Sequence, residues 1–275
     1  MMGRSRDVQV DYRHPLPVRL WHWTNAAAIG VLLFTGLLIF DIHPHLYWGE
    51  AGQEGQGAFI SFSGDHFEDK VPRTGLRIGS HRWNTTGRLG VLSDSGFGDQ
   101  YLLLAPAPDD WQYGATRGWH FAFAWLLAFS LPLYALYLFW SRRLSSTLLP
   151  TRAQLRGRSL LREISEHLRL HRARGEAARR YNALQKLTYL LVIYGLMPVM
   201  VLSGLAMSNT MNAVWPGLAE LFGGHQSARS VHFMTAMLLA LFILVHVFQV
   251  FVAGFGNLMR SMITGRFVSE RERAR

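Results

Sequence analysis

The sequence contains no cysteine, which excludes a disulfide framework, cysteine-ligated zinc, iron–sulfur clusters and covalently attached c-type haem. Charged residues are also scarce, at 17% of the 275 residues, whereas a soluble domain usually carries about 25%. Apolar residues make up 49% of the chain, and this content excludes intrinsic disorder. A redox centre on this chain must therefore use ligands other than cysteine sulfur. The twelve histidines are the obvious candidates.

Four apolar stretches are each long enough to cross a bilayer, which requires about 20 residues. They cover residues 20–40, 119–140, 184–207 and 231–254, and none contains Asp, Glu or Arg. Lys186 lies at the start of the third stretch, where its long side chain can reach the headgroup region. The N-terminus shows no pattern of a removable signal sequence. We therefore predict a single all-α, four-helix integral membrane domain over residues 1–275.

The charged residues gather between the apolar stretches. The 141–183 segment carries eleven Arg and three acidic residues, whereas the 41–116 segment carries five basic and ten acidic residues. Basic loops stay on the cytoplasmic side of a membrane. We therefore expect both termini and 141–183 on the cytoplasmic face of a bacterial inner membrane, with 41–116 in the periplasm. The net charge of +10 then results from the basic segments on the cytoplasmic side. It does not indicate a nucleic-acid partner, and none is expected.

Two of the segments outside the spans are longer than simple connectors. The 41–116 insertion is rich in glycine and predicts short strands near 58–62 and 87–92, with too little core to stand alone. It should pack on the membrane domain or on a partner. Residues 151–174 place apolar side chains at helical spacing among arginines: Leu161, Ile164 and Leu168. This pattern fits a helix on the anionic lipid surface, and a solvated basic loop fits it equally well.

Four histidines lie inside the predicted spans, and their depths form two pairs. His232 and His246 are fourteen residues apart on the fourth span, so they share nearly one face about 21 Å apart. Because successive helices run in opposite directions, His22 lies at the inner level of His246, and His120 at the outer level of His232. A lone intramembrane histidine is as often a packing residue as a functional one. A facing histidine pair, however, can hold a haem iron with no open position, which suits electron transfer.

Arginines and glycines accompany these histidines. One helical turn before three of them stand Arg19, Arg117 and Arg229, where a guanidinium could bind a haem propionate, although arginine also flanks membrane spans in general. Gly36 and Gly204 lie at the outer level and would let a planar group approach the backbone, although small residues serve helix packing as well. A short echo surrounds these glycines, FTGL at 34–37 and LSGL at 202–205.

The chain resembles the di-haem cytochrome b membrane subunits of bacterial nickel hydrogenases, formate dehydrogenases and thiosulfate reductases. The resemblance covers all four spans and rests on RLWHW around His22, RGWHF around His120, and the pair His232 and His246. The stretches RHPLPVRLWHW, HPHLYWGE, NTTGRLGVL and YNALQK look most like the thiosulfate-reductase-type branch. Members of that branch are similar to subunits that serve molybdenum enzymes of the sulfite-oxidase type. The large 41–116 insertion departs from the hydrogenase and formate dehydrogenase subunits, so their docking surfaces are not carried over.

The resemblance implies two b-type haems, an inner one on His22 and His246 and an outer one on His120 and His232. It further implies electron transfer between a periplasmic redox subunit, such as a molybdopterin enzyme, and membrane quinone. Candidates for the quinone site lie at the inner mouth of the third span and beside the inner histidine: Asn182, Gln185 and Lys186, with Trp21 and Trp23. The same tryptophans and lysine are also typical of an interfacial belt.

Two other functions remain open on the sequence. One is a stand-alone, quinone-linked cytochrome b that oxidises or reduces a small species such as superoxide, without an enzyme partner. The other is a transporter that couples protons through intramembrane histidines. An oxidised and reduced absorption spectrum separates the transporter from both cytochromes, and co-purification with a periplasmic subunit separates the two cytochromes.

Overall fold

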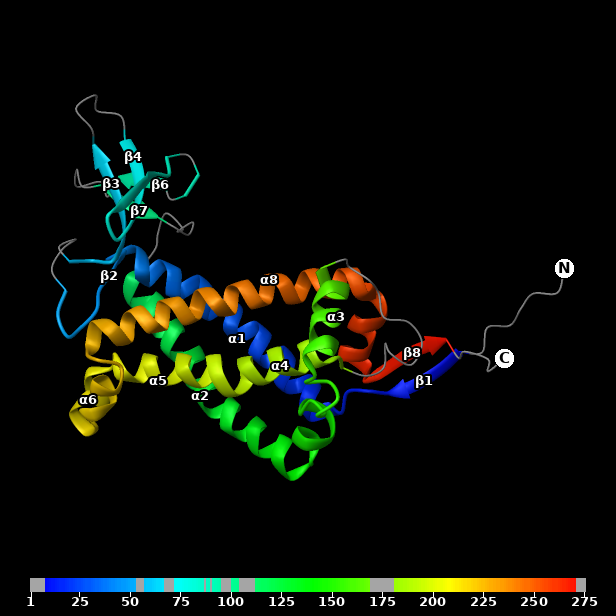
Figure 1. Ribbon diagram of the computed structural model, residues 1–275. Coiled ribbons are helices and arrows are strands. Elements are labelled where there is room, and N and C mark those ends of the chain that lie inside the picture. The colour runs from blue at the N-terminus through cyan, green and yellow to red at the C-terminus, as the bar shows by residue number, and fades with distance from the viewer. Residues whose placement is uncertain are drawn as a thin grey trace. The chain divides into compact units, whose positions relative to one another are not determined.

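The computed structural model describes most of the chain (Figure 1). The described residues are 8–52, 57–66, 72–86, 88–89, 91–94, 100–103, 112–168 and 181–270. Some sequence-based expectations fall on other residues. Part of the strand expected at 87–92, residues 104–111 of the insertion and residues 169–180 of the basic loop lie outside the described residues.

Four helical stretches are long and apolar enough to cross a membrane, which confirms the expected all-α, four-span architecture. The first two are α1 (Leu16–Asp41) and α2 (Tyr113–Trp140). The third combines α4 (Ala183–Leu191), the π-helix η3 (Val192–Leu196) and α5 (Met197–Ala206), and the fourth is α8 (His225–Thr264). These helices extend past several ends of the apolar stretches, because backbone hydrogen bonding continues into the polar interface.

Two local irregularities interrupt the long helices. Pro198 has no backbone N–H to donate, and the π-turn η3 ends two residues before it. A π-turn is a common way for a helix to absorb a break in its hydrogen-bond ladder. Gly254 has a φ of +115° and divides α8 into two helical parts. Only glycine adopts such a φ without steric cost.

Large apolar side chains cover the outside of the helices. Phe139 is 67% exposed and Leu244 is 68% exposed, and many other aromatic and aliphatic residues on α2 and α8 are similarly open. Such a surface would be unstable in water but is matched by the hydrocarbon of a bilayer. Together with the helix lengths, this surface identifies a multi-pass membrane protein.

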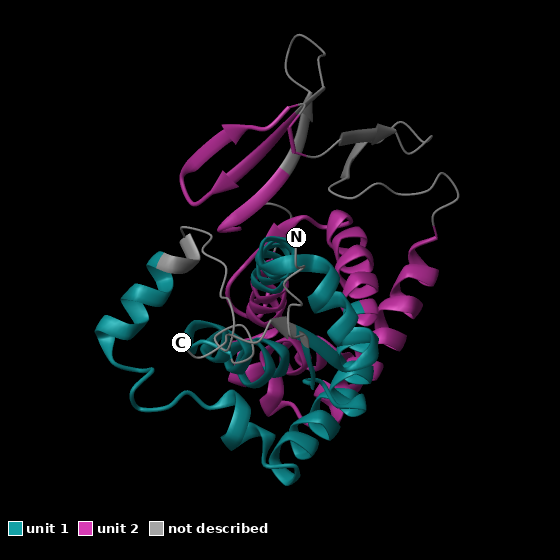
Figure 2. Cartoon of the chain, turned by 90° about the vertical axis from the view of Figure 1, so that its right-hand side faces the viewer, with its two compact units in different colours: residues 1–26, 129–198, 238–275 teal, residues 27–128, 199–237 magenta. Residues whose placement is uncertain are grey.

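The chain divides into two compact units (Figure 2). The first comprises residues 1–26, 129–198 and 238–275, so it holds one end of each membrane helix. In this unit β1 (Val8–Tyr12) pairs antiparallel with β8 (Arg266–Glu270), with Val10 opposite Val268. The π-helix η1 (Leu144–Leu148) follows α2, and α3 (Gly157–Leu168) lies within the 151–174 segment, whose sequence pattern fits a surface helix and a solvated basic loop equally well.

The second unit comprises residues 27–128 and 199–237. Its sheet has the order β2-β3-β4-β5, all antiparallel: β2 (His45–Leu46), β3 (Ile60–His66), β4 (Pro72–Ile78) and β5 (His81–Asn84). A separate hairpin pairs β6 (Val91–Asp94) with β7 (Gln100–Leu103). Two short helices, α6 (Asn209–Val214) and α7 (Gly217–Leu221), lead into α8. Most of the insertion's described residues are therefore strands rather than an irregular loop.

The loop after α1 caps the start of α8. The carbonyl of Gly49 accepts from the backbone N–H groups of Gln226 and Ser227, each at 3.1 Å. The carboxylate of Glu50 accepts from the N–H of His225 at 2.9 Å. The first N–H groups of a helix have no partner within the helix and carry its positive dipole end, so a carbonyl and a carboxylate stabilise them. These bonds hold the end of α1 beside the beginning of α8.

Candidate functional site: two histidine pairs

The second unit brings His120 of α2 together with His232 of α8. Their ring centres are 6.4 Å apart and their planes are inclined by 63°. Both side chains are half-buried among helices of the same unit. This distance is at the wide end of the range for an edge-to-face ring contact.

A hydroxyl group holds the His120 ring by its Nδ1 atom. Thr35 Oγ1 lies 2.9 Å from His120 Nδ1 and 2.7 Å from the carbonyl oxygen of Val31. Because a hydroxyl has one proton and the carbonyl can only accept, that proton goes to Val31. The Thr35 oxygen must then accept from Nδ1–H. His120 is thereby held as the tautomer whose Nε2 carries a free lone pair.

His232 is held in the same way from the third membrane helix. Ser203 Oγ lies 3.1 Å from His232 Nδ1 and donates to the carbonyl of Val199 at 2.6 Å. Ser203 is fully buried, with no exposed surface. The serine oxygen accepts from Nδ1–H for the same reason as Thr35, so the Nε2 lone pair of His232 is free as well.

A glycine follows each of these hydroxyl residues and lets the ring lie against the helix backbone. A Cβ atom built on Gly36 would stand 3.3 Å from His120 Cε1, and one on Gly204 would stand 3.1 Å from His232 Cε1. Both distances are tighter than ordinary carbon contacts. The FTGL and LSGL echo therefore encodes two equivalent histidine cradles. Sequence reasoning noted the echo and the glycines but missed Thr35 and Ser203 as site residues.

The first unit brings His22 of α1 together with His246 of α8. Their ring centres are 6.3 Å apart and their planes are inclined by 56°. Phe242 stacks on His246 with centres 5.6 Å apart, and Trp23 meets His22 edge-on at 5.0 Å. Among the described residues, the buried Nδ1 of His22 has no hydrogen-bond partner. Within the described part of the chain, His22 thus lacks the hydroxyl contact that holds His120 and His232.

The spacing of both pairs fits a single iron ion between two imidazoles. An imidazole nitrogen lies about 2 Å from an ion that it ligates, so two rings on opposite sides have centres roughly 6 Å apart. Within the described part of the chain, no group of three or more His, Asp or Glu side chains could hold a metal. A metal between two histidines would need its other ligands from elsewhere. The four nitrogens of a haem would provide that set, and the free Nε2 lone pairs of His120 and His232 would bind its iron.

The three arginines expected beside propionates each contact protein groups. Arg229 donates to the backbone carbonyls of His43 and His45, the latter at 2.7 Å. Arg19 donates to the carbonyl of Ile263. Arg117 lies over the rings of Tyr113 and Phe121, at 5.7 and 5.5 Å. A guanidinium has five N–H donors, so these contacts leave donors for a carboxylate, and the propionate role stays a prediction.

Of the three quinone candidates on the third span, two have a structural role at the start of α4. The Asn182 side chain accepts from the N–H of Gln185 at 2.8 Å, and the Gln185 side chain accepts from the N–H of Asn182 at 3.3 Å. This reciprocal capping box stabilises the helix start. Lys186 donates to Leu149 O at 3.2 Å and Gln154 Oε1 at 3.3 Å. The quinone role of these residues stays a prediction.

Comparisons with known proteins show which family the chain resembles. The profile of the family described as prokaryotic cytochrome b561 matches residues 13–265. A protein of Azospira oryzae, named as the protein-methionine-sulfoxide reductase subunit YedZ1, is 36% identical over 86% of this chain and 89% of its own length. Two further relatives are named as Ni/Fe-hydrogenase B-type cytochrome subunits. The Rhodobacter capsulatus protein is 36% identical over 28% of each chain. The Cupriavidus necator protein is 34% identical over 31% of this chain and 34% of its own length. No solved structure matches the chain.

Proposed function

The chain belongs to the prokaryotic cytochrome b561 family, and from this premise we propose that it is a di-haem electron-transfer subunit linking a periplasmic redox enzyme to membrane quinone. Membership of the family implies a b-type haem in a membrane-spanning chain. When bound, two such haems supply one-electron transfer from one side of the membrane to the other. The further claims, of two haems, a molybdenum-type partner and quinone, belong to this proposal.

The spacing of the two histidine pairs, 6.3 and 6.4 Å between ring centres, is the observation that carries the proposal. His22 and His246 would hold the inner haem, and His120 and His232 the outer haem. A haem iron held by two of these histidines would have no position open to oxygen or another small ligand, which would favour electron transfer. The spacing fits the linked subunit and a stand-alone cytochrome that acts on superoxide alike, and co-purification of a periplasmic partner separates the two.

Neighbouring residues fix the orientation of the two outer histidines. Thr35 and Ser203 each accept the Nδ1 proton and so keep both rings in one tautomer and one orientation. Gly36 and Gly204 let the rings reach close to the helix backbone. Ligands held in a fixed position would move little when the iron gains or loses an electron. A small rearrangement would suit rapid electron exchange with a partner.

The names of the relatives support a partner enzyme. The Azospira oryzae relative is named as a reductase subunit, and the other two are named as hydrogenase subunits. The sequence also resembles the branch similar to subunits of molybdenum enzymes, so we propose a molybdopterin redox subunit as partner. The basic 141–183 segment and C-terminal tail support an inner-membrane location with both termini in the cytoplasm. The insertion would then meet the partner in the periplasm.

The number of haems tests the ligand pairing directly. Purified protein should carry two b haems per chain, since four histidines form two separate pairs. A pyridine haemochrome assay, with protein quantified by amino-acid analysis, measures this ratio. One haem per chain in a correctly folded preparation would contradict the pairing.

The insertion is expected to bind the periplasmic partner. Residues 60–110 can be replaced by a short Gly-Ser linker, which keeps Gly49 and Glu50 on the start of α8. We expect co-purification of the partner to be lost while both haem spectra remain, because all four histidines lie outside the replaced range. Undiminished partner binding would contradict the docking role. A wild-type protein that purifies with full activity and no partner would favour the stand-alone cytochrome.

A further inference from the structure

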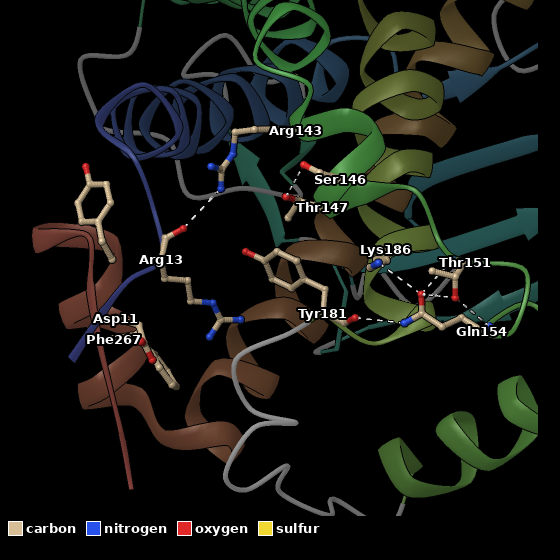
Figure 3. A pocket seen from close by; sticks show the side chains of 11 residues that line it. Asp11, Arg13, Arg143, Ser146, Thr147, Thr151, Gln154, Tyr181, Lys186 and Phe267 are labelled. Carbon is tan, nitrogen blue, oxygen red and sulfur yellow. Dashed lines mark hydrogen bonds between the residues drawn. The ribbon is translucent and has the colours of Figure 1, made fainter. Parts of the chain in front are cut away.

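A cavity of about 670 Å³ lies within the first unit, where four membrane helices begin or end (Figure 3). Its walls come from segments far apart in the sequence: Arg13 precedes α1, Arg143 follows α2, Lys186 stands in the first turn of α4, and Phe267 follows α8. Successive spans run in opposite directions, so the start of α1, the end of α2, the start of α4 and the end of α8 lie at the same face of the membrane. The cavity therefore lies at the level of the lipid headgroups. This position follows from the membrane spans and does not depend on haem binding.

Three cationic side chains line the cavity against one carboxylate, that of Asp11. Arg143 donates to the carbonyl of Arg13 at 3.5 Å, and a guanidinium has further N–H groups to donate. Lys186 uses two hydrogen bonds, to Leu149 and Gln154, and an ammonium has three donors. Positively charged N–H groups that can donate hydrogen bonds therefore remain available inside the cavity.

Hydroxyl groups complete the polar wall. Ser146 and Thr147 of η1 lie within 3.3 Å of each other, and Thr151 follows on the same segment. Arg13 lies over the rings of Tyr181 and Phe267, at 5.1 and 4.8 Å, which keeps its guanidinium at the cavity wall. Serine and threonine hydroxyls together with guanidinium and ammonium groups are the donors that recognise phosphate.

The positive potential of this region already acts on a neighbouring buried side chain. Burial, followed by the charges of Arg13 and Arg143, lowers the pKa of His14 to about 4. His14 is therefore neutral at physiological pH and adds no charge of its own. The same cations that disfavour a protonated histidine favour an anion.

We propose that this cavity binds the phosphate of an anionic phospholipid headgroup. Basic pockets between membrane helices on the cytoplasmic side are suited to such lipids. The adjoining helix α3 supports a lipid over a free anion, because it exposes the apolar side chains Leu161, at 69%, and Ile164, at 39%. An amphipathic helix of this kind lies in the bilayer interface. The acyl chains would extend along the exposed apolar faces of the helices.

Native mass spectrometry of the full-length protein in neutral detergent tests the proposal. With added phosphatidylglycerol, we expect one tightly bound lipid per chain. Arg143→Gln and Lys186→Gln should each weaken binding by about tenfold, because each removes a charged donor to the phosphate. Arg142→Gln is the matched control, since Arg142 precedes Arg143, carries the same charge and does not line the cavity. Binding of all three variants equal to wild type would overturn the proposal.

Further arms of the same experiment separate the sources of the anion. Phosphatidylcholine, inorganic phosphate and a short-chain quinone are offered in competition with phosphatidylglycerol. Failure of all three to displace it at tenfold excess supports the anionic lipid. Displacement by inorganic phosphate would overturn the lipid assignment in favour of a soluble anion, and displacement by the quinone would assign the cavity to quinone. The haem absorption spectrum of each variant reports folding separately, and Arg143→Lys should restore lipid binding.

Discussion

In His246→Ala the inner haem is expected to be lost or to become reactive to added ligands, while the outer haem stays intact. His22 would then face an empty position, whereas His120 and His232 keep their 6.4 Å spacing and their hydroxyl contacts. Haem content should fall from two to one per chain if the inner haem is lost, and an inner haem that is retained should bind added ligands. The remaining haem should still be reduced from the periplasmic side, but quinone turnover should fall to background, since the proposed exit is the inner haem.

His232→Ala should give the mirror result, with the outer haem lost and the inner haem retained. Quinone should then still reoxidise the inner haem, while exchange with a periplasmic donor is lost. His167→Ala is the control, because His167 belongs to α3, outside the membrane spans and outside the insertion that is proposed to bind the partner. Quinone reduction that persists in His246→Ala and fails in His232→Ala would place the quinone at the outer haem. Two unchanged haems in both variants would disprove the ligand assignment.

Removing the hydroxyl groups behind the outer histidines should weaken that haem selectively. In Thr35→Val and Ser203→Ala the Nδ1–H of the ring loses its hydroxyl acceptor, so the orientation and the tautomer of the ring are less constrained, and His232 keeps its backbone contact with Met200. Loss of such a contact typically lowers metal affinity or activity by about 10- to 100-fold. The midpoint potential and the electron paramagnetic resonance signal of the outer haem should shift. The inner haem should not change, and it serves as an internal reference.

The conservative variants Thr35→Ser and Ser203→Thr keep the hydroxyl and should restore the wild-type potential. In haem-free protein, ¹⁵N spectra of labelled histidine should show His120 and His232 as the Nδ1–H tautomer, and the two hydroxyl-free variants should lose that preference. A role in packing alone would leave both the tautomer and the potential unchanged. If the potential of the inner haem shifted equally, the hydroxyls would act on the fold rather than on the outer ligands.

The polar residues at the start of the third span show how a local structural signal can resemble a functional one. Asn182 and Gln185 have the spacing of a capping box, and the structure shows them bonded to each other at the start of α4. Their place at the inner mouth of a span makes them quinone candidates on the sequence. The first N–H groups of a helix have no partner within the helix, so polar residues at that position often accept hydrogen bonds from them. Such a role explains their presence without a ligand.

The four membrane helices and the depth of each histidine were determined by the sequence alone. Runs of apolar residues must form helices in a bilayer, because every backbone polar group needs a partner within the segment. The rise of an α-helix then sets the depth of every residue, and this is why the sequence places His22 at the level of His246. Both are consequences of local backbone geometry.

Only the tertiary structure decided which side chains hold the histidines and what the insertion forms. Thr35 and Ser203 reach their partners across helices, and that contact depends on how each helix is rotated about its axis. Lipid and helix interfaces are almost equally apolar, so the hydrophobic pattern does not specify this rotation. The cap that Gly49 and Glu50 place on α8 joins residues about 175 positions apart. Pairing at such distance depends on the whole chain and leaves no periodic signal in the sequence.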